Sequence, residues 1–420
     1  METYRFLFDL AIILFSTKVL GLITRKMNMP QVVGALLAGL LLGPGMFGLI
    51  TQTEYIMESA EVGVVILMFC AGMETDVQEL KKSGKASFVI ALCGVIVPLF
   101  GGFFVAAAFN RPGVFESDAA CSLFLQNVFI GVILTATSVS ITVETLKELG
   151  KLKTRSGNAI LGAAVIDDIL GIIALTIITS MADSSVNIGV VLIKIVGFFV
   201  FCGVAGYIFY RFFTGWCNRS EGGLQRHAIV AFVFALMMAF IAERVFGVAD
   251  ITGAYIAGII ISMTPKERYL ASKFDVLSTL YLSPIFFASI GLKVELPKMS
   301  VALVEFAVIL TLVAILTKVV GCGLGARIMG YTNLQSVRIG VGMISRGEVA
   351  LIVASKGGTL GLMSSELMGP VVIVVIITTI IAPIILKPVF LKGPSTTPAD
   401  ANPIAENIES IQNYNEENRG

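Results

Sequence analysis

The chain has 420 residues, a length that in a soluble protein would correspond to two or three domains. Its composition excludes that class, because hydrophobic residues make up 56% and charged residues only 14%, and the mean hydropathy is +0.90. Soluble chains carry about 25% charged residues. The net charge of +1, without a basic stripe, also excludes nucleic acid as a partner. We therefore predict an all-α polytopic protein embedded in a lipid bilayer.

Apolar runs near the roughly 20 residues that cross a bilayer as a helix recur along the chain. They predict thirteen transmembrane helices, at 6–24, 31–50, 57–73, 84–109, 124–146, 156–181, 189–213, 227–246, 249–264, 275–293, 301–326, 339–356 and 366–391. The second run carries Gly43-Pro44, which predicts a bend near its end. Residues 392–420 are acidic and rich in Asn and Pro, which predicts a disordered cytoplasmic tail.

The distribution of Lys and Arg indicates the orientation, since cytoplasmic loops carry an excess of both. With the N-terminus placed outside, the alternate loops on the inner side hold nineteen basic residues and those on the outer side six. A wrong number of helices would mix the two sets. The sequence therefore predicts a multi-pass protein of the cell membrane, with the N-terminus outside and the C-terminus cytoplasmic.

Two short motifs recur at the same separation. The motif at 34–39 (GALLAG) matches 253–258 (GAYIAG), and 72–76 (GMETD) matches 291–295 (GLKVE), both at an offset of 219 residues. The first copies fall on predicted helices two and three and the second on nine and ten. This shift of seven helices, an odd number, predicts an inverted repeat of helices 1–6 and 8–13. Inverted repeats are typical of secondary transporters, whose sites lie near the bilayer midplane.

Two adjacent acids lie in the middle of predicted helix six, at Asp167 and Asp168. A carboxylate at the bilayer centre costs about 2.5–3.5 kcal/mol on insertion scales, so such a residue indicates function. Neighbours on a helix point about 100° apart, so the two acids need different partners. Lys318, central in predicted helix eleven, is the best-placed cation to pair with one of them.

Predicted helix five carries a cluster of hydroxyl groups between apolar runs, at Thr135, Thr137 and Ser138. In isolation such hydroxyls tend to bond to carbonyl groups one turn back. Beside an acid pair, they are candidate oxygen ligands for a hard cation.

Predicted helix twelve holds a second polar group, made of Ser345, Arg346 and Glu348. Glycines on both sides of Arg346 predict a broken helix. The two charges could then meet freed backbone groups or the dipoles of the helix ends, so a structural role is as plausible as a direct one.

These stretches resemble the monovalent cation–proton antiporter family, in particular its bacterial NapA-, GerN- and Kef-like branch. The resemblance covers nearly the whole chain up to about residue 391 and is carried by four segments together: 29–44, 69–74, 165–168 and 345–351. In this chain, Ser138 stands near the position where some members place an acid in the break of helix five.

The resemblance implies a homodimer with a moving core and crossed, broken helices five and twelve. Helices 1–3 (1–83) and 8–10 (227–298) would form the dimerisation domain, helices 4–6 (84–185) and 11–13 (299–391) the transport core, and helix seven (186–226) the connector. It also implies that Asp168 holds the cation, that Asp167 pairs with Lys318, and that paired acids accompany electrogenic exchange.

We therefore expect a secondary antiporter, not an enzyme, that needs no cofactor. It would exchange a monovalent cation, first Na⁺ at Asp168 and otherwise K⁺ or Li⁺, for protons by an elevator mechanism. A K⁺/H⁺ antiporter or a sodium-coupled solute symporter of the same fold remains an alternative. An intramembrane aspartyl protease is disfavoured, because its two acids must face each other from different helices.

Overall fold

The computed structural model describes residues 4–111, 119, 121–182, 187–219, 224–294 and 299–391. Within these ranges all regular structure is helical, as expected of an all-α chain. The predicted tail at 392–420 lies outside the described residues.

The helices follow the apolar runs of the sequence. In chain order they are α1 (Arg5–Lys26), α2 (Gln31–Leu42), α3 (Glu54–Glu74), α4 (Val77–Phe109), α5 (Leu123–Ile133), α6 (Val139–Glu148), α7 (Arg155–Ala182), α8 (Ile188–Arg219), α9 (Leu224–Ile241), α10 (Asp250–Ser262), α11 (Glu267–Leu277), α12 (Ser283–Leu292), α13 (Val301–Ile328), α14 (Asn333–Gly342), α15 (Glu348–Thr359) and α16 (Met368–Leu391). Two π-helical stretches, η2 (Ala242–Phe246) and η3 (Ser278–Leu282), continue α9 and join α11 to α12, and a short 3₁₀ turn, η4 (Ser365–Leu367), precedes α16.

In the described part of the chain, nine helical stretches are long and apolar enough to cross a membrane, and three shorter apolar helices accompany them. The total of thirteen crossings stays a prediction. Two of the predicted spans are each divided between two short helices, α5 with α6 and α14 with α15. The second predicted span is shorter than expected, since α2 ends at Leu42, before Gly43-Pro44.

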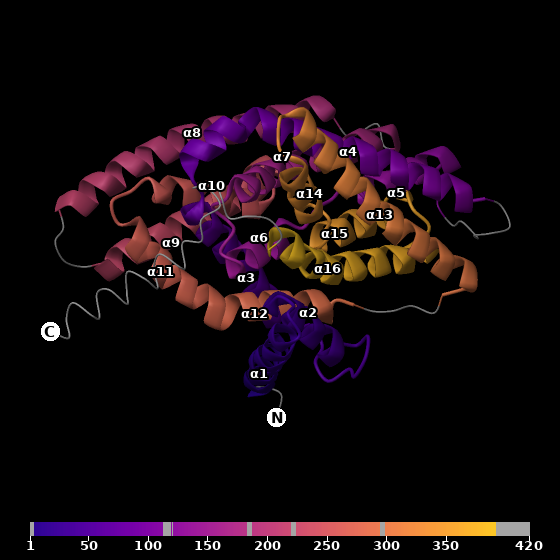
Figure 1. Ribbon diagram of the computed structural model, residues 1–420, viewed down its shortest axis with the longest axis horizontal. Coiled ribbons are helices and arrows are strands. Elements are labelled where there is room, and N and C mark those ends of the chain that lie inside the picture. The colour runs from indigo at the N-terminus through magenta and orange to yellow at the C-terminus, as the bar shows by residue number, and fades with distance from the viewer. Residues whose placement is uncertain are drawn as a thin grey trace.

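The helices pack as two groups. In one, called here the broken-helix group, α4 packs against α5, α7 and α13, and α16 packs against α6, α13, α14 and α15. In the other, the scaffold group, α3 packs against α9, α10, α11 and α12, while α2 packs against α1 and α12. Figure 1 shows α13–α16 gathered on one side, with α9–α11 on the other and α1 and α2 at the lower edge. The predicted division into a core and a dimerisation domain follows the same lines and stays a prediction.

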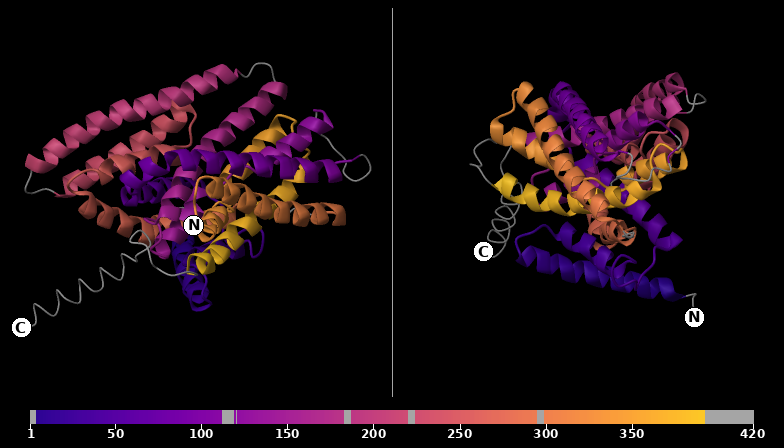
Figure 2. Two further views of the ribbon diagram at one scale, coloured as in Figure 1. Left: turned by 45° about the horizontal axis from the view of Figure 1, so that its top comes forward. Right: turned by 90° about the vertical axis from the view of Figure 1, so that its right-hand side faces the viewer.

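Helix α8 lies along the periphery of the molecule (Figure 2). Several of its large apolar side chains are exposed. Ile193, Val196 and Phe212 are 73%, 63% and 63% exposed. Water would penalise such a surface, whereas lipid tails do not, so this face fits a helix in contact with the bilayer.

Glycines bring the scaffold helices into close contact at two crossings. At the first, a Cβ on Gly291 of α12 would lie 2.7 Å from the carbonyl carbon of Gly39 of α2. At the second, a Cβ on Gly258 of α10 would lie 2.8 Å from the Cα of Gly72 of α3. Adding the repeat offset of 219 to residues 39 and 72 gives 258 and 291. The two crossings are therefore counterparts, as a two-fold internal repeat requires, although the inversion of that repeat stays a prediction.

The crossing of α3 and α10 generates a prediction for stability. We expect Gly72→Ala to destabilise the protein by about 1–3 kcal/mol, because the added methyl group meets backbone atoms, which cannot move aside as a side chain can. Thermal unfolding of the purified protein in detergent measures the effect. Gly203→Ala on α8 is the matched control, since nothing lies within 4 Å of its Cβ position. Equal melting of the two variants would contradict the tight crossing.

Candidate functional site

Two interrupted helices meet at their breaks in the broken-helix group. The chain leaves helical geometry between α5 and α6, and again between α14 and α15. The backbone N–H of Ser138 donates to the carbonyl of Ser345, and the Ser345 hydroxyl donates to the carbonyl of Ser138, both at 2.7 Å. Each break thus supplies hydrogen-bond partners that the other lacks, which satisfies backbone groups that lipid could not satisfy.

Arg346 places a positive charge at this crossing. The side chain is fully buried and donates from Nη2 to the carbonyls of Leu134, at 2.8 Å, and Ala314, at 3.0 Å. Leu134 caps the C-terminal end of α5, where the helix dipole is negative, so a cation is favourable there. A third bond, from Nη1 to Ile344, is 3.0 Å long. Arg346 therefore holds the break together.

Beside the crossing, Asp167 on α7 and Lys318 on α13 form a buried ion pair. The Lys318 Nζ lies 2.9 Å from Asp167 Oδ1 and 3.1 Å from Oδ2. Thr137, in the break after α5, donates its hydroxyl to Asp167 Oδ2 at 2.6 Å. A Cβ at Gly94 of α4 would clash with the Sγ of Cys322 on α13, so the glycine lets the two helices approach closely beside the ion pair. Asp167 is thus balanced by a cation and a hydroxyl.

Asp168 has different surroundings, although it is the next residue on α7. It is half-buried, and within the part of the chain that the structure describes no ion pair or hydrogen bond holds its carboxylate. Its side chain lines a cavity of about 70 Å³. The cavity is lined by Val132, Thr135, Ala136, Asp167, Asp168, Gly171, Ile172, Leu175, Ala249, Val349 and Val353.

The predicted site residues fall into three places. Thr135 shares the cavity with Asp168, and its hydroxyl donates to the carbonyl of Val132, which leaves oxygen lone pairs free to accept or ligate. Ser138 and Ser345 face each other across the crossing and do not line the cavity. Glu348 begins α15 and points away, to Lys293, with 3.8 Å between Oε2 and Nζ. The structure therefore gathers Asp168, Asp167 and Thr135, and separates Glu348 from them.

Sequence reasoning missed two hydroxyl groups that complete the crossing. Thr142 of α6 donates to the carbonyl of Gly342, at 2.7 Å, and lies 3.0 Å from the Ser345 hydroxyl. Thr379 of α16 donates to the carbonyl of Arg346. Threonines are common in apolar helices and usually bond one turn back, so neither carried a signal in the sequence.

The arrangement combines one compensated acid with one accessible acid. Asp167 has its countercharge in Lys318, while Asp168 has only the cavity and the oxygens around it. A carboxylate in such a place is stabilised by a proton or by a cation, and the two compete for the same lone pairs. No cluster of three or more His, Cys, Asp or Glu side chains suited to a resident metal occurs among the described residues.

Comparisons with known proteins agree with this chemistry. Residues 11–392 match the family described as "Sodium/hydrogen exchanger, transmembrane". The chain is 38% identical to the Na⁺/H⁺-K⁺ antiporter GerN of Bacillus cereus, over 92% of this chain and 97% of that protein. It is 40% identical to the probable Na⁺/H⁺ antiporter GerT of Bacillus cereus, over 92% of this chain and 100% of that protein.

The fold has solved counterparts as well. The sodium proton antiporter MjNhaP1 of Methanocaldococcus jannaschii, from a three-dimensional electron-microscopy map, aligns with a TM-score of 0.72 at 16% identity, over 92% of this chain and 96% of that one. Its structure at pH 8 aligns with a TM-score of 0.64 at 18% identity. With its apolar helices and the match over nearly its full length, the chain is an integral membrane protein of the sodium/hydrogen exchanger family, whose members are monovalent cation–proton antiporters.

Proposed function

We propose that the protein exchanges Na⁺ for protons across the cell membrane, with Asp168 as the exchange site. The observation that carries this proposal is the contrast between the two adjacent acids. Asp167 is paired with Lys318 at 2.9 Å, whereas Asp168 faces a cavity without an ion pair or hydrogen bond among the described residues. Two relatives support the choice of ion, because GerN is a Na⁺/H⁺-K⁺ antiporter and GerT a probable Na⁺/H⁺ antiporter.

Competition at one carboxylate is sufficient for coupling. Asp168 binds either a proton or a partly dehydrated cation, with Thr135 as a further oxygen ligand. The cavity of about 70 Å³ is small, since a water molecule in the liquid occupies roughly 30 Å³. If the site crosses the barrier only when Asp168 is occupied, then inward movement of protons drives outward movement of the cation.

The movement we propose is an elevator, in which the broken-helix group shifts against the scaffold group. The cavity lies where the groups meet, because Ala249, at the start of α10, faces residues of α5, α7 and α15 across it. Such a movement needs a stationary partner, and a homodimer formed through the scaffold group would supply it.

Exchange of K⁺ is the second candidate, because the relative GerN is a Na⁺/H⁺-K⁺ antiporter. A sodium-coupled symporter would bind its solute together with Na⁺ and release no protons. In proteoliposomes with a pH-sensitive dye inside, we expect Na⁺ to drive proton flux at lower concentrations than K⁺ or Li⁺. Proton flux that none of the three ions drives would overturn the proposal, and a stronger response to K⁺ would change the ion.

We predict that Asp168→Asn abolishes cation-driven proton flux, because the amide cannot exchange a proton for a cation. Asp76→Asn is the matched control. Asp76 caps α4 by accepting from the backbone N–H of Gln78, at 2.8 Å, and asparagine caps a helix equally well. The control should transport like the wild type. Near-normal exchange by Asp168→Asn in proteoliposomes would refute the assignment.

We also predict that wild-type exchange is electrogenic, with two protons moved for one cation. The second proton comes from Lys318, if the cation frees Asp167 from the ion pair. Asp167→Asn combined with Lys318→Gln removes both charges without leaving one of them buried and alone. Asp168 would then remain as the single exchange site, and we expect slower, electroneutral exchange.

The measurement imposes a membrane potential with valinomycin and K⁺ while Na⁺ is the transported ion. A net charge gains about 2.3 kcal/mol per 100 mV, so the wild-type rate should follow the imposed potential and that of the double variant should not. A wild-type rate that ignores the potential would exclude two-proton exchange.

A further inference from the structure

On the predicted inner side, charged residues that lie outside the candidate site connect the two helix groups. The last turn of α6 carries Lys147 and Glu148. The Lys147 Nζ is paired with Asp275 of α11 and lies 3.9 Å from Glu74, the last residue of α3. Glu148 accepts from the backbone N–H of Gln31, at the start of α2, at 2.7 Å. One turn of the broken-helix group is thus tied to three helices of the scaffold group.

These contacts lie at the end of α7 opposite the cavity of Asp168. The cavity is lined by Gly171, Ile172 and Leu175, which follow Asp168 toward the C-terminal end of α7. The last residue of α6, by contrast, is joined to the start of α7 by the short segment 149–154. The cavity of Asp168 therefore extends toward one end of α7, and the charged contacts of α6 lie at the other end.

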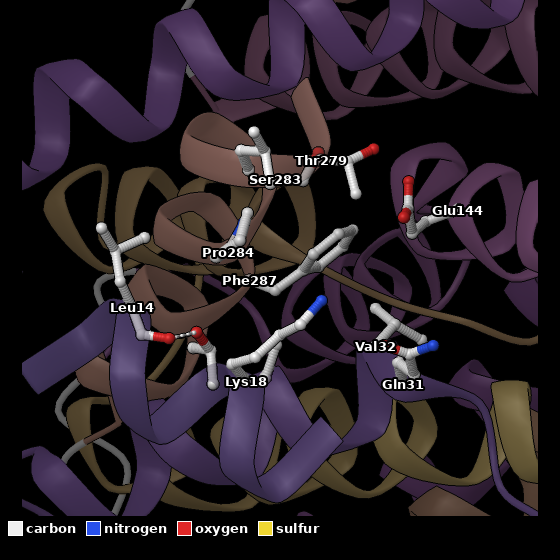
Figure 3. A pocket seen from close by; sticks show the side chains of 12 residues that line it. Leu14, Lys18, Gln31, Val32, Glu144, Thr279, Ser283, Pro284 and Phe287 are labelled. Carbon is white, nitrogen blue, oxygen red and sulfur yellow. Dashed lines mark hydrogen bonds between the residues drawn. The ribbon is translucent and has the colours of Figure 1, made fainter. Parts of the chain in front are cut away.

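Apolar packing fills only part of this inner contact: Val143 and Leu146 of α6 belong to the same buried core as Phe69 of α3. A pocket of about 300 Å³ lies between Glu144 of α6 and residues of α1, α2, η3 and α12. Figure 3 shows Glu144 facing this hollow opposite Gln31, Val32 and Phe287. On this side α6 therefore borders a hollow, and its charge pairs with the scaffold group act beside the apolar packing.

The internal repeat gives a counterpart on the other side. Glu74 plus the offset of 219 is Lys293, at the end of α12, and Lys293 lies 3.8 Å from Glu348, at the start of α15. Glu74 thus pairs with α6, the second half of one broken helix, and Lys293 pairs with α15, the second half of the other. The scaffold residue is negative in the first pair and positive in the second.

From these contacts we infer that Lys147, with Glu74 and Asp275, is a latch that closes the inner side while Asp168 faces the outer side. The latch must open before the site can reach the cytoplasm. This inference rests on the proposed exchange between two sides of the membrane. The three latch residues contact neither the cation nor Asp168, and they act on transport only through the position of α6.

A native thiol reports whether the latch is open. Cys70 lies one turn before Glu74 on α3, hence on the same face, and is 2% exposed. In inside-out vesicles without an ion gradient, a membrane-impermeant maleimide is added and labelling of Cys70 is followed by mass spectrometry. We test two latch variants, Lys147→Gln and the double variant Glu74→Gln with Asp275→Asn. We expect each to speed the labelling roughly fivefold, because the loss of a partly exposed ion pair makes the open state more populated by about that factor.

Three controls separate the latch from general loosening. Lys82→Gln removes an ion pair of 2.8 Å that lies within α4 alone, and labelling of Cys70 should stay at the wild-type rate. Lys147→Arg keeps the charge and should keep Cys70 protected. Cys322, fully buried on α13, should stay unlabelled in all variants.

Unchanged labelling of Cys70 in both latch variants would overturn the inference, and so would faster labelling of Cys70 and Cys322 together. Transport by the wild type is measured separately. Its absence would refute the proposed exchange, whereas the labelling rates test only the latch.

Discussion

Compensation of charge inside the membrane is the constraint on which this structure depends. A carboxylate or ammonium group in a medium without water is costly unless a partner and hydrogen bonds accompany it. Asp167 has Lys318 and Thr137 as partners. Arg346 has the carbonyl of Leu134 at the end of α5 and that of Ala314 on α13. Because those charges have partners in place, we propose the adjacent Asp168 as the acid that exchanges its occupant.

The broken helices follow from the same constraint. Interrupting a transmembrane helix frees backbone groups that lipid cannot satisfy, and here two breaks satisfy each other through Ser138 and Ser345. Arg346 then joins the end of α5 to α13 through Leu134 and Ala314. The result is a hydrogen-bonded crossing next to the cavity, while charged side chains as well as buried apolar ones join the inner boundary with the scaffold group.

Much of the fold and the principal charges could be predicted from the sequence. Apolar runs predict helices in nearly the right places, and rare charges within such runs single out Asp167, Asp168 and Lys318. Apart from the pairing of Asp167 with Lys318, which the family resemblance implies, the contact partners could not be predicted in the same way. Glu348 and Lys293 are 55 positions apart, and nothing in their spacing indicates a contact. Thr142 and Thr379 lie among ordinary helical residues, and their role appears only when α6, α14 and α16 pack together.

The central claim is that proton and cation compete for Asp168, and equilibrium binding tests it most directly. Na⁺ is titrated calorimetrically into the purified protein in two buffers with different enthalpies of protonation, which gives the number of protons released per bound ion. We predict proton release on Na⁺ binding by the wild type, and no binding by Asp168→Asn. Na⁺ binding without proton release, or wild-type binding by the variant, would contradict the account.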